Sequence, residues 1–240
     1  MPKEQSKILI TGASSGIGLA IASCLIQCNY QVVALARNSS RIPTEVKNNN
    51  NFTFISVDFF DLDTLPSQLK SIQKKHNDIN SVICCAGKGR FASIEEFSYS
   101  QIKELIDLNF TSQAFVVRAF LPRLKQQKNA SIVFIGSEAA LKGGKKGAIY
   151  SASKFALRGF AQAIREECSS SNIGVTIINP GMVNTPFFDQ LDFSPGPDAD
   201  NYIQTNDLAN TIVFILESRQ GTVFDEINLS PLKKVIDFKK

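Results

Sequence analysis

Short apolar runs alternate with longer amphipathic runs along the chain, and this alternation limits the fold more than any other feature. The apolar runs predict strands at 7–11, 31–36, 53–57, 81–85, 131–136, 175–179 and 226–229. Apolar residues at helical spacing predict helices at 16–28, 62–75, 98–127, 148–170 and 207–217. Strands that alternate with helices pair in parallel through right-handed crossovers. The sequence therefore predicts a doubly wound α/β fold, with a mostly parallel sheet of about seven strands and helices on both faces.

Length and composition limit the remaining possibilities. The 240 residues suit one large domain or two small ones, but no linker interrupts the alternation, which favours a single domain over 1–240. The net charge of +4 is too weak to indicate a nucleic-acid partner. The sequence contains no run of about 18 apolar residues, so it predicts no membrane span. The N-terminal residues are polar and lack the apolar segment of a signal peptide. We therefore expect a cytoplasmic protein.

The cysteines and the single histidine offer little for a disulfide framework or a metal site. The five cysteines are odd in number and unevenly spaced. Zinc sites need paired short spacings and histidine, and His76 is the only histidine. We expect reduced thiols, no metal, and a surface position without a role for His76.

A glycine-rich turn separates the first strand from the first helix. It runs Thr11-Gly12-Ala13-Ser14-Ser15-Gly16-Ile17-Gly18. Gly12 permits a tight turn, Gly16 lets a pyrophosphate approach the backbone, and Gly18 lets the helix pack close to the sheet. Free N–H groups at the helix N-terminus then face the phosphates. Three glycines in this position favour a dinucleotide site over a turn that only connects two elements.

A tyrosine and a lysine four residues apart suggest acid–base chemistry. Tyr150 and Lys154 share one face of a predicted helix. An ammonium group favours the phenolate and lowers the pKa of a tyrosine from its usual value of about 10. Ser137 follows the neighbouring strand and is placed to donate to a substrate oxygen. We assign Tyr150 as general acid in carbonyl reduction, Lys154 as the group that lowers its pKa, and Ser137 as the carbonyl-orienting donor. On spacing alone, an exposed helix pair is the favoured interpretation of this tyrosine and lysine.

Together, these motifs and their order resemble the short-chain dehydrogenase/reductase family. The matching segments are T-G-x-x-x-G-x-G at 11–18, Ala86-Gly87, Ser137, Tyr150-x-x-x-Lys154, Pro180-Gly181 and Thr185. The resemblance covers about residues 7 to 230 and implies a Rossmann fold that binds a nicotinamide dinucleotide. It implies that Lys154 also holds the nicotinamide ribose and that Asn109 supports a proton-relay water. It further implies a dimer or tetramer packed through the helices at 98–127 and 148–170.

The resemblance also implies a set of cofactor-binding residues and a substrate lid at about 186–204. The cofactor residues are Gly12, Ser14, Ser15, Gly16, Ile17, Gly18, Arg37, Asp58, Ala86, Gly87, Tyr150, Lys154, Pro180, Gly181, Val183 and Thr185. In the lid, Phe187 and Phe188 suggest some apolar cover over the substrate.

The end of the second strand predicts the choice of cofactor. An acidic residue there would bind the ribose hydroxyls of NAD, whereas a basic residue accommodates the 2′-phosphate of NADP. The segment 31–44 holds Arg37 and no Asp or Glu, and a guanidinium group suits a phosphate dianion. This favours NADP(H) over NAD(H). Asp58 resembles the acidic residue that the family places near the adenine.

Two departures from the family pattern affect function. Cys84-Cys85 replaces the usual Asn-Asn before Ala86-Gly87, which weakens the expected local bracing of the sheet. We favour buried structural cysteines over a redox-sensing thiol. The last strand also lacks the Gly-Gly segment of acyl-carrier reductases, which favours hydroxy acids or mixed carbonyls. Basic loop residues Lys88, Arg90, Lys142, Lys145 and Lys146 form either a rim that steers an anionic substrate or an ordinary solvated loop.

The sequence thus predicts an NADP(H)-dependent oxidoreductase that interconverts a secondary alcohol and a ketone or aldehyde, with a small-molecule substrate. A dinucleotide-binding redox sensor or regulator on the same fold is the alternative, and its expected sign is a broken catalytic set. An epimerase or dehydratase would share Y-x-x-x-K, but such relatives usually have a longer chain with a substrate domain.

Overall fold

Seven parallel strands form the central sheet of the computed structural model, which describes residues 6–219 and 221–239. The strand order is β3-β2-β1-β4-β5-β6-β8, and every neighbouring pair runs parallel. The bounds are β1 (Lys7–Thr11), β2 (Gln31–Ala36), β3 (Phe52–Ser56), β4 (Ile79–Cys84), β5 (Ala130–Ile135), β6 (Ile173–Pro180) and β8 (Glu226–Leu229). The predicted doubly wound sheet of seven strands is confirmed.

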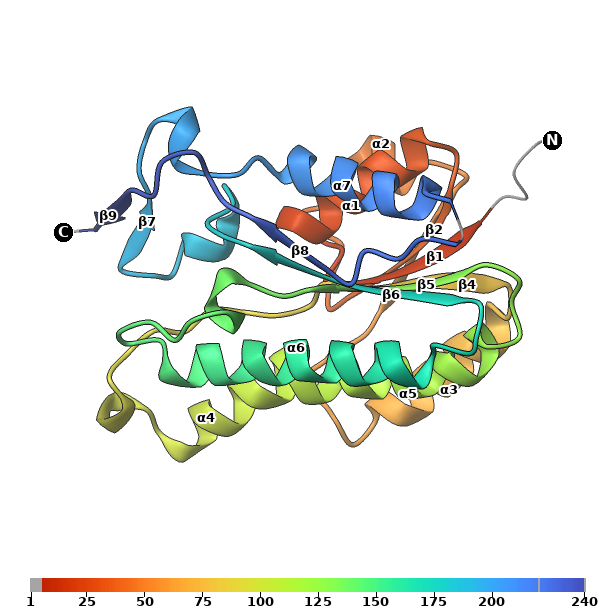
Figure 1. Cartoon of the computed structure of the whole chain (residues 1–240), viewed down its shortest axis with the longest axis horizontal. Coiled ribbons are helices and arrows are strands. Elements are labelled where there is room, and N and C mark those ends of the chain that lie inside the picture. The colour runs from red at the N-terminus through yellow and green to blue at the C-terminus, as the bar shows by residue number, and fades with distance from the viewer. Residues whose placement is uncertain (1–5, 220, 240) are drawn as a thin grey trace.

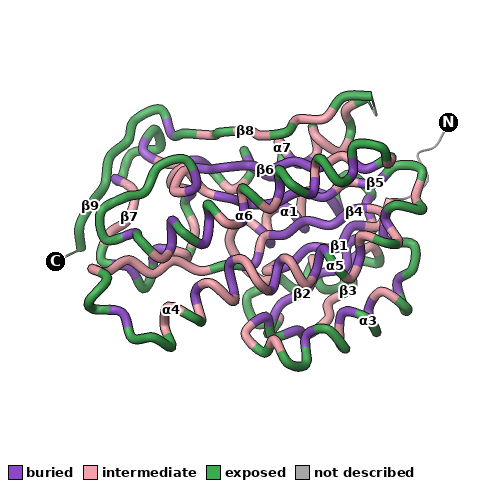
Figure 2. Tube along the Cα trace, turned by 60° about the horizontal axis from the view of Figure 1, so that its bottom comes forward, coloured by how far each residue is buried: buried purple, intermediate pink, exposed green. Residues whose placement is uncertain are grey.

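Helices cover both faces of this sheet (Figure 1). One face carries α1 (Gly16–Gln27), α2 (Thr44–Lys47) and α7 (Thr205–Glu217), and the other carries α3 (Leu65–Lys75), α4 (Tyr99–Ile106), α5 (Ser112–Leu124) and α6 (Ala148–Glu167). Successive side chains of a strand point to opposite faces, so Leu9 joins the core under α5 and α6 while Ile8 and Ile10 join the core under α1. The central strands β1, β2, β4, β5 and β6 are buried along most of their length, whereas the edge strands β3 and β8 are only partly buried (Figure 2).

The helix predicted at 98–127 contains a π-helical turn. The chain runs from α4 through a π segment at Asp107–Thr111 into α5, which ends at Leu124. A π turn widens the helix by one residue and often marks a functional site. This one carries Asn109, which is fully buried.

Several other elements differ from the sequence-based prediction. β4 begins at Ile79 rather than at 81, and α3 begins at Leu65 rather than at 62. The sequence interpretation missed α2 and a two-stranded antiparallel ribbon of β7 (Phe193–Pro195) and β9 (Ile236–Phe238). Three-residue strands are too short for a periodicity of two to identify them.

The expected surface position of His76 is wrong. His76, the C-cap residue of α3, is only 9% exposed. Burial, followed by the charges of Lys7 and Lys75, holds the pKa of His76 below its usual value.

The strand order changes direction between β1 and β4. From β1 the chain proceeds outward to β2 and β3, and it then returns to place β4 on the other side of β1. Ligands of open α/β sheets bind outside the carboxyl ends of the strands at such a switch point. The residues that follow β1, β4 and β5 therefore form the candidate site.

Candidate active site

In the glycine turn after β1, side chains at Gly12 and Gly18 would collide with neighbouring backbone atoms. Gly12 has a φ of +68°, and a Cβ atom there would lie 2.8 Å from the Cα of Ala86. A Cβ on Gly18 would overlap the carbonyl oxygen of Gly12. The turn therefore packs directly on the segment after β4 and on the first turn of α1, as predicted for Gly12 and Gly18.

The N-terminus of α1 leaves its backbone N–H groups available for an anion. Ser15 is the N-cap residue but makes no side-chain capping bond, and the first turn contains no acidic residue. Ser14 and Ile17 lie in the same turn and are partly exposed. Across from it, the side chain of Thr185 would be 3.4 Å from a Cβ on Gly16. These features fit a pyrophosphate at a helix N-terminus.

Arg37 and Asp58 both contact Phe60, Arg37 at its ring and Asp58 at its backbone N–H. Arg37 is exposed just after β2, and its guanidinium carbon lies 5.1 Å from the centre of the Phe60 ring. Asp58 follows β3, and its Oδ1 accepts the backbone N–H of Phe60 at 3.0 Å. The structure thus brings the two residues predicted for the adenosine end together beside β2 and β3.

The tyrosine, lysine and serine of the predicted catalytic set lie together. Tyr150 and Lys154 are one turn apart on α6 and are 6% and 7% exposed. Ser137, which follows β5, lies near enough to the Tyr150 hydroxyl to oppose the rise in its pKa. Lys154 Nζ lies 6.0 Å from the Tyr150 ring centre and donates to the carbonyl oxygen of Ile135 at 3.0 Å. They form a buried pair rather than an exposed one.

Burial shifts the titration of both residues. It raises the pKa of Tyr150 to about 12, partly opposed by the Ser137 side chain and reinforced by the charge of Glu138. Burial lowers the pKa of Lys154 to about 8. The predicted lowering of the tyrosine pKa by Lys154 is therefore wrong for this structure. Desolvation of the phenolate outweighs other effects, and the lysine Nζ is directed to the carbonyl of Ile135.

Asn109 ties the π turn to the segment after β4. Its Oδ1 accepts the backbone N–H of Lys88 at 2.9 Å, and its Nδ2 donates to the Lys88 carbonyl at 3.0 Å and to Ser153 Oγ at 3.1 Å. A Cβ on Gly87 would lie 3.1 Å from Asn109 Oδ1 and 3.7 Å from Lys154 Nζ. Ala86, Gly87, Asn109 and Lys154 are thus neighbours.

Thr11 braces the site, a role that the sequence interpretation missed. Its Oγ1 accepts the backbone N–H groups of Cys85 and Ala86 at 2.9 and 3.0 Å. Its hydroxyl donates to Oε1 of the fully buried Gln113 on α5 at 3.0 Å. This network joins β1, the end of β4 and α5, and it supplies the bracing that the Cys84-Cys85 pair led us to doubt. Gln113 lies 102 positions from Thr11, so no local pattern identifies the pair.

The two adjacent cysteines point to opposite faces of the sheet. Cys84 belongs to the core under α5 and α6, and Cys85 packs against the opposite core. Burial raises the pKa of both thiols, that of Cys85 to about 12. All five cysteines are free thiols.

The loop after β6 closes the other side of the site. Pro180 ends β6, and the N–H of Gly181 donates to the Leu229 carbonyl at 2.8 Å. Val183 forms a bridge with Ile203, and the Thr185 hydroxyl accepts the N–H of Phe187. Thr185 thus places this loop next to the glycine turn, and Phe187 places it next to Tyr150. The centres of the Phe187 and Tyr150 rings are 6.0 Å apart.

The predicted basic rim is only partly available for a ligand. Lys88 Nζ pairs with Glu104 and lies 4.9 Å from the Phe60 ring centre. Arg90 is half-buried, while Lys142, Lys145 and Lys146 are exposed in the loop before α6.

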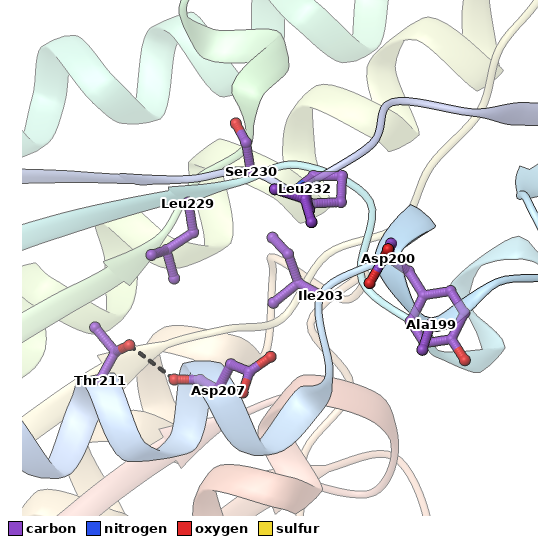
Figure 3. Close-up of a pocket in the computed structure, with 10 residues that line it drawn as sticks. Ala199, Asp200, Ile203, Asp207, Thr211, Leu229, Ser230 and Leu232 are labelled. Atoms are coloured by element: carbon purple, nitrogen blue, oxygen red, sulfur yellow. Dashed lines mark hydrogen bonds between the residues drawn. The ribbon is translucent and has the colours of Figure 1, made fainter.

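Figure 3 shows a pocket of about 300 Å³ between the residues around Asp200, the start of α7 and the segment after β8, with Ile203 and Leu229 in its wall. None of the predicted catalytic or cofactor-binding residues lines this pocket, but Ala199, Asp200, Tyr202 and Ile203 belong to the predicted lid at 186–204. Among the residues the structure describes, no group of three or more His, Cys, Asp or Glu side chains is placed to hold a metal ion. No helix in the described part of the chain is long and apolar enough to cross a bilayer.

Comparisons with known proteins agree with this geometry. A family model described as short chain dehydrogenase matches residues 6–194. An uncharacterized oxidoreductase of Staphylococcus epidermidis is 28% identical over 234 residues, covering 97% of this chain and 100% of the relative.

Two solved structures share the fold. ElxO with NADP bound superposes with a TM-score of 0.83 at 21% identity, over 95% of this chain and 98% of its own. An alcohol dehydrogenase from the archaeon Thermococcus sibiricus, complexed with 5-hydroxy-NADP, has a TM-score of 0.83 at 24% identity, over 94% and 96%.

Proposed function

The chain belongs to the short-chain dehydrogenase family, and from this we propose that it is an NADP(H)-dependent oxidoreductase. It would interconvert a secondary alcohol and a ketone or aldehyde. The family membership makes it an enzyme of the alcohol/carbonyl oxidoreductase class that uses a nicotinamide dinucleotide. The choice of NADP, the direction and the roles of individual residues are the proposal.

One observation carries the proposal: Ser137 and the buried Tyr150 and Lys154 lie together at the carboxyl edge of the sheet, where the glycine turn also opens. With a pKa of about 12, Tyr150 is a protonated phenol at neutral pH. That form donates a proton to an oxygen as negative charge develops on it. Ser137 would hold the same oxygen in place, and buried Lys154 would supply positive charge behind it.

The residues of the glycine turn and its surroundings fit a dinucleotide. Gly12, Gly16 and Gly18 leave the backbone open, and the uncapped N-terminus of α1 suits a pyrophosphate. We propose that Ala86, Gly87, Pro180, Gly181, Val183 and Thr185 line its nicotinamide half. The bound nicotinamide would supply the hydride.

Arg37 supports NADP(H) over NAD(H). Its guanidinium is exposed after β2 and stacks on Phe60, which leaves its planar fork of N–H donors free for a phosphate dianion. Nearby Asp58 already accepts a backbone N–H. Two proteins of similar fold carry NADP or an NADP derivative in their solved structures, in agreement with this choice.

Replacement of the general acid tests the proposal. Tyr150→Phe removes the transferable proton and keeps the ring, so carbonyl reduction with NADPH should fall by about 100-fold or more. NADPH binding, followed by fluorescence titration, should remain close to wild type. Tyr99→Phe is the matched control, because Tyr99 is 94% exposed on α4, and it should reduce carbonyls normally. Near-normal turnover by the Tyr150 variant would refute the assigned mechanism.

The redox-sensor alternative gains less support. Sensor thiols are accessible and ionise readily, whereas burial raises the pKa of both Cys84 and Cys85. The catalytic set of Ser137, Tyr150 and Lys154 is intact, which a sensor would not require.

We also propose a homodimer or homotetramer in the cytoplasm that packs through α5 and α6. Phe155 supports this packing face, since the large apolar ring is 43% exposed on α6.

A further inference from the structure

Tyr150 and four phenylalanine rings form a closed circuit of ring contacts, in which Phe91 and Phe187 are the two that contact Tyr150. Phe91 lies 5.0 Å from Tyr150, and Phe193 lies 5.0 Å from Phe91, measured between ring centres. Phe188 is 5.9 Å from Phe193 and 5.2 Å from Phe187, whose ring is in turn 6.0 Å from Tyr150. We call Phe91, Phe187, Phe188 and Phe193 the aromatic collar.

The collar is assembled from distant parts of the chain. Phe91 lies in the loop after β4, and a Cβ on nearby Gly89 would overlap the Phe187 ring. Phe187 and Phe188 belong to a short 3₁₀ helix (Pro186–Phe188), and Phe193 begins β7. The collar thus joins the loop after β4 to the segment after β6 beside the ring of Tyr150.

The segment 231–239 holds the collar in position. β9 pairs with β7, so that Phe238 lies opposite Phe193. The Lys239 N–H donates to the Asp192 carbonyl at 2.8 Å, and Lys239 Nζ donates to the Phe188 carbonyl. These bonds hold the backbone at Phe188 and next to Phe193. The two rings of the collar therefore have fixed positions.

Most of the charged side chains near the collar already form ion pairs or hydrogen bonds with other groups of the protein. Lys88 pairs with Glu104, and Glu138 pairs with Lys234 at 2.9 Å. Lys154 lies behind Tyr150 and donates to a backbone carbonyl. Arg90 and Lys146 lie in the loops on either side of Phe91, and the Lys146 carbonyl accepts the N–H of Ala92 at 2.8 Å. Together with exposed Lys142 and Lys145, they are the cations of the predicted rim that remain to pair with an anionic substrate.

From this geometry we infer the substrate class: the group attached to the reacting carbonyl carbon is an uncharged alkyl or aryl group held by the aromatic collar. The inference rests on the proposed function. Aromatic rings favour apolar surface and provide no partner for a carboxylate, whose burial without one is costly. Hydroxy acids, one of the two classes suggested by the sequence, are therefore disfavoured relative to apolar carbonyl compounds.

Two ketones of matched shape test this inference. 4-Methylacetophenone and 4-acetylbenzoate share the same carbonyl group and differ by a methyl group against a carboxylate. We expect wild-type protein with NADPH to favour the methyl compound at least about tenfold in kcat/KM. The same order should appear in binding, measured by ligand-observed NMR on the NADPH complex.

A cation placed in the collar should reverse the preference. Phe193→Lys should shift the ratio of the two ketones by about tenfold or more toward 4-acetylbenzoate. Phe214→Lys is the matched control, because Phe214 lies 57% exposed on α7 and stacks on Phe224 away from the collar; its ratio should equal that of wild type. If Phe193→Lys does not fold, Phe193→Leu should retain the wild-type order.

Binding and turnover separate the two proposals. Preferred binding of the methyl compound without any reduction would refute the proposed function and leave the collar inference standing. Stronger binding of 4-acetylbenzoate to wild type, lost in Arg90→Gln or Lys146→Gln, would overturn the collar inference. Absence of binding of both ketones would overturn it as well.

Discussion

The buried ammonium of Lys154 couples the stability of the protein to pH. Its pKa falls from 10.5 to about 8 on folding because of burial. Below pH 8 the lysine is charged in both states and the folded state bears the full burial cost. Between about pH 8 and 10.5 the unfolded state binds more protons, so folding stability rises with pH. The shift from 10.5 to about 8 corresponds to about 3 kcal/mol.

Lys154→Met should therefore be more stable than wild type at pH 7, and the difference should shrink toward pH 10. Urea denaturation at pH 7, 8.5 and 10 measures it. The raised pKa of Tyr150 lowers stability above pH 10, but it does so in both proteins and does not affect the comparison. A difference that stays constant with pH would contradict the assigned shift of Lys154.

Arg37 should decide the choice of cofactor. Arg37→Asp removes the donors for a 2′-phosphate and adds a charge that repels it, so the NADPH/NADH ratio in kcat/KM should fall by about 100-fold. Arg118→Asp is the control, since Arg118 is also exposed but lies on α5. If the Arg37 variant still prefers NADPH, the assignment of this residue to the phosphate fails.

At the scale of elements, Thr11 links β1, the end of β4 and α5 through its hydrogen bonds. Thr11→Val keeps the shape of the side chain but leaves the N–H groups of Cys85 and Ala86, and Oε1 of Gln113, without their partner. Unsatisfied buried groups should lower the free energy of unfolding by about 3 kcal/mol. Thr53→Val on β3 is the matched control, because Thr53 is exposed. Chemical denaturation of the two variants compares them, and equal stability would show that the network contributes nothing.

The sequence predicted those elements that are determined by residues close to one another along the chain. The glycine turn and the apolar strands depend on residues close in sequence, so both could be read from it. The π turn at Asp107–Thr111 could not, because its apolar residues follow the same helical spacing as α4 and α5. The β7–β9 ribbon joins Phe193 to Phe238 through three residues on each side. The Thr11–Gln113 bond and the collar likewise exist only once the chain has folded.

The whole molecule should assemble through its longest helices. Wild-type protein should elute in size-exclusion chromatography as a dimer or tetramer of the 26.3 kDa chain. Phe155→Glu should shift it toward monomer, because a charge replaces an apolar ring that would be buried between copies. Ile94→Glu is the control: it adds the same charge at a side chain that is 53% exposed. A wild-type monomer would exclude this packing.

The π turn makes the length of the chain between α4 and α5 critical. Each residue of an α-helix turns the chain by about 100° and advances it by about 1.5 Å. An insertion of one residue within Asp107–Thr111 would rotate α4 by about that angle relative to α5, so that Leu105 and Phe120, both buried, could no longer face their cores together. A deletion of one residue there would close the widened turn and displace Asn109 from its partners Lys88 and Ser153. Insertions and deletions should thus be tolerated in the exposed loop before α6 but not in the π turn.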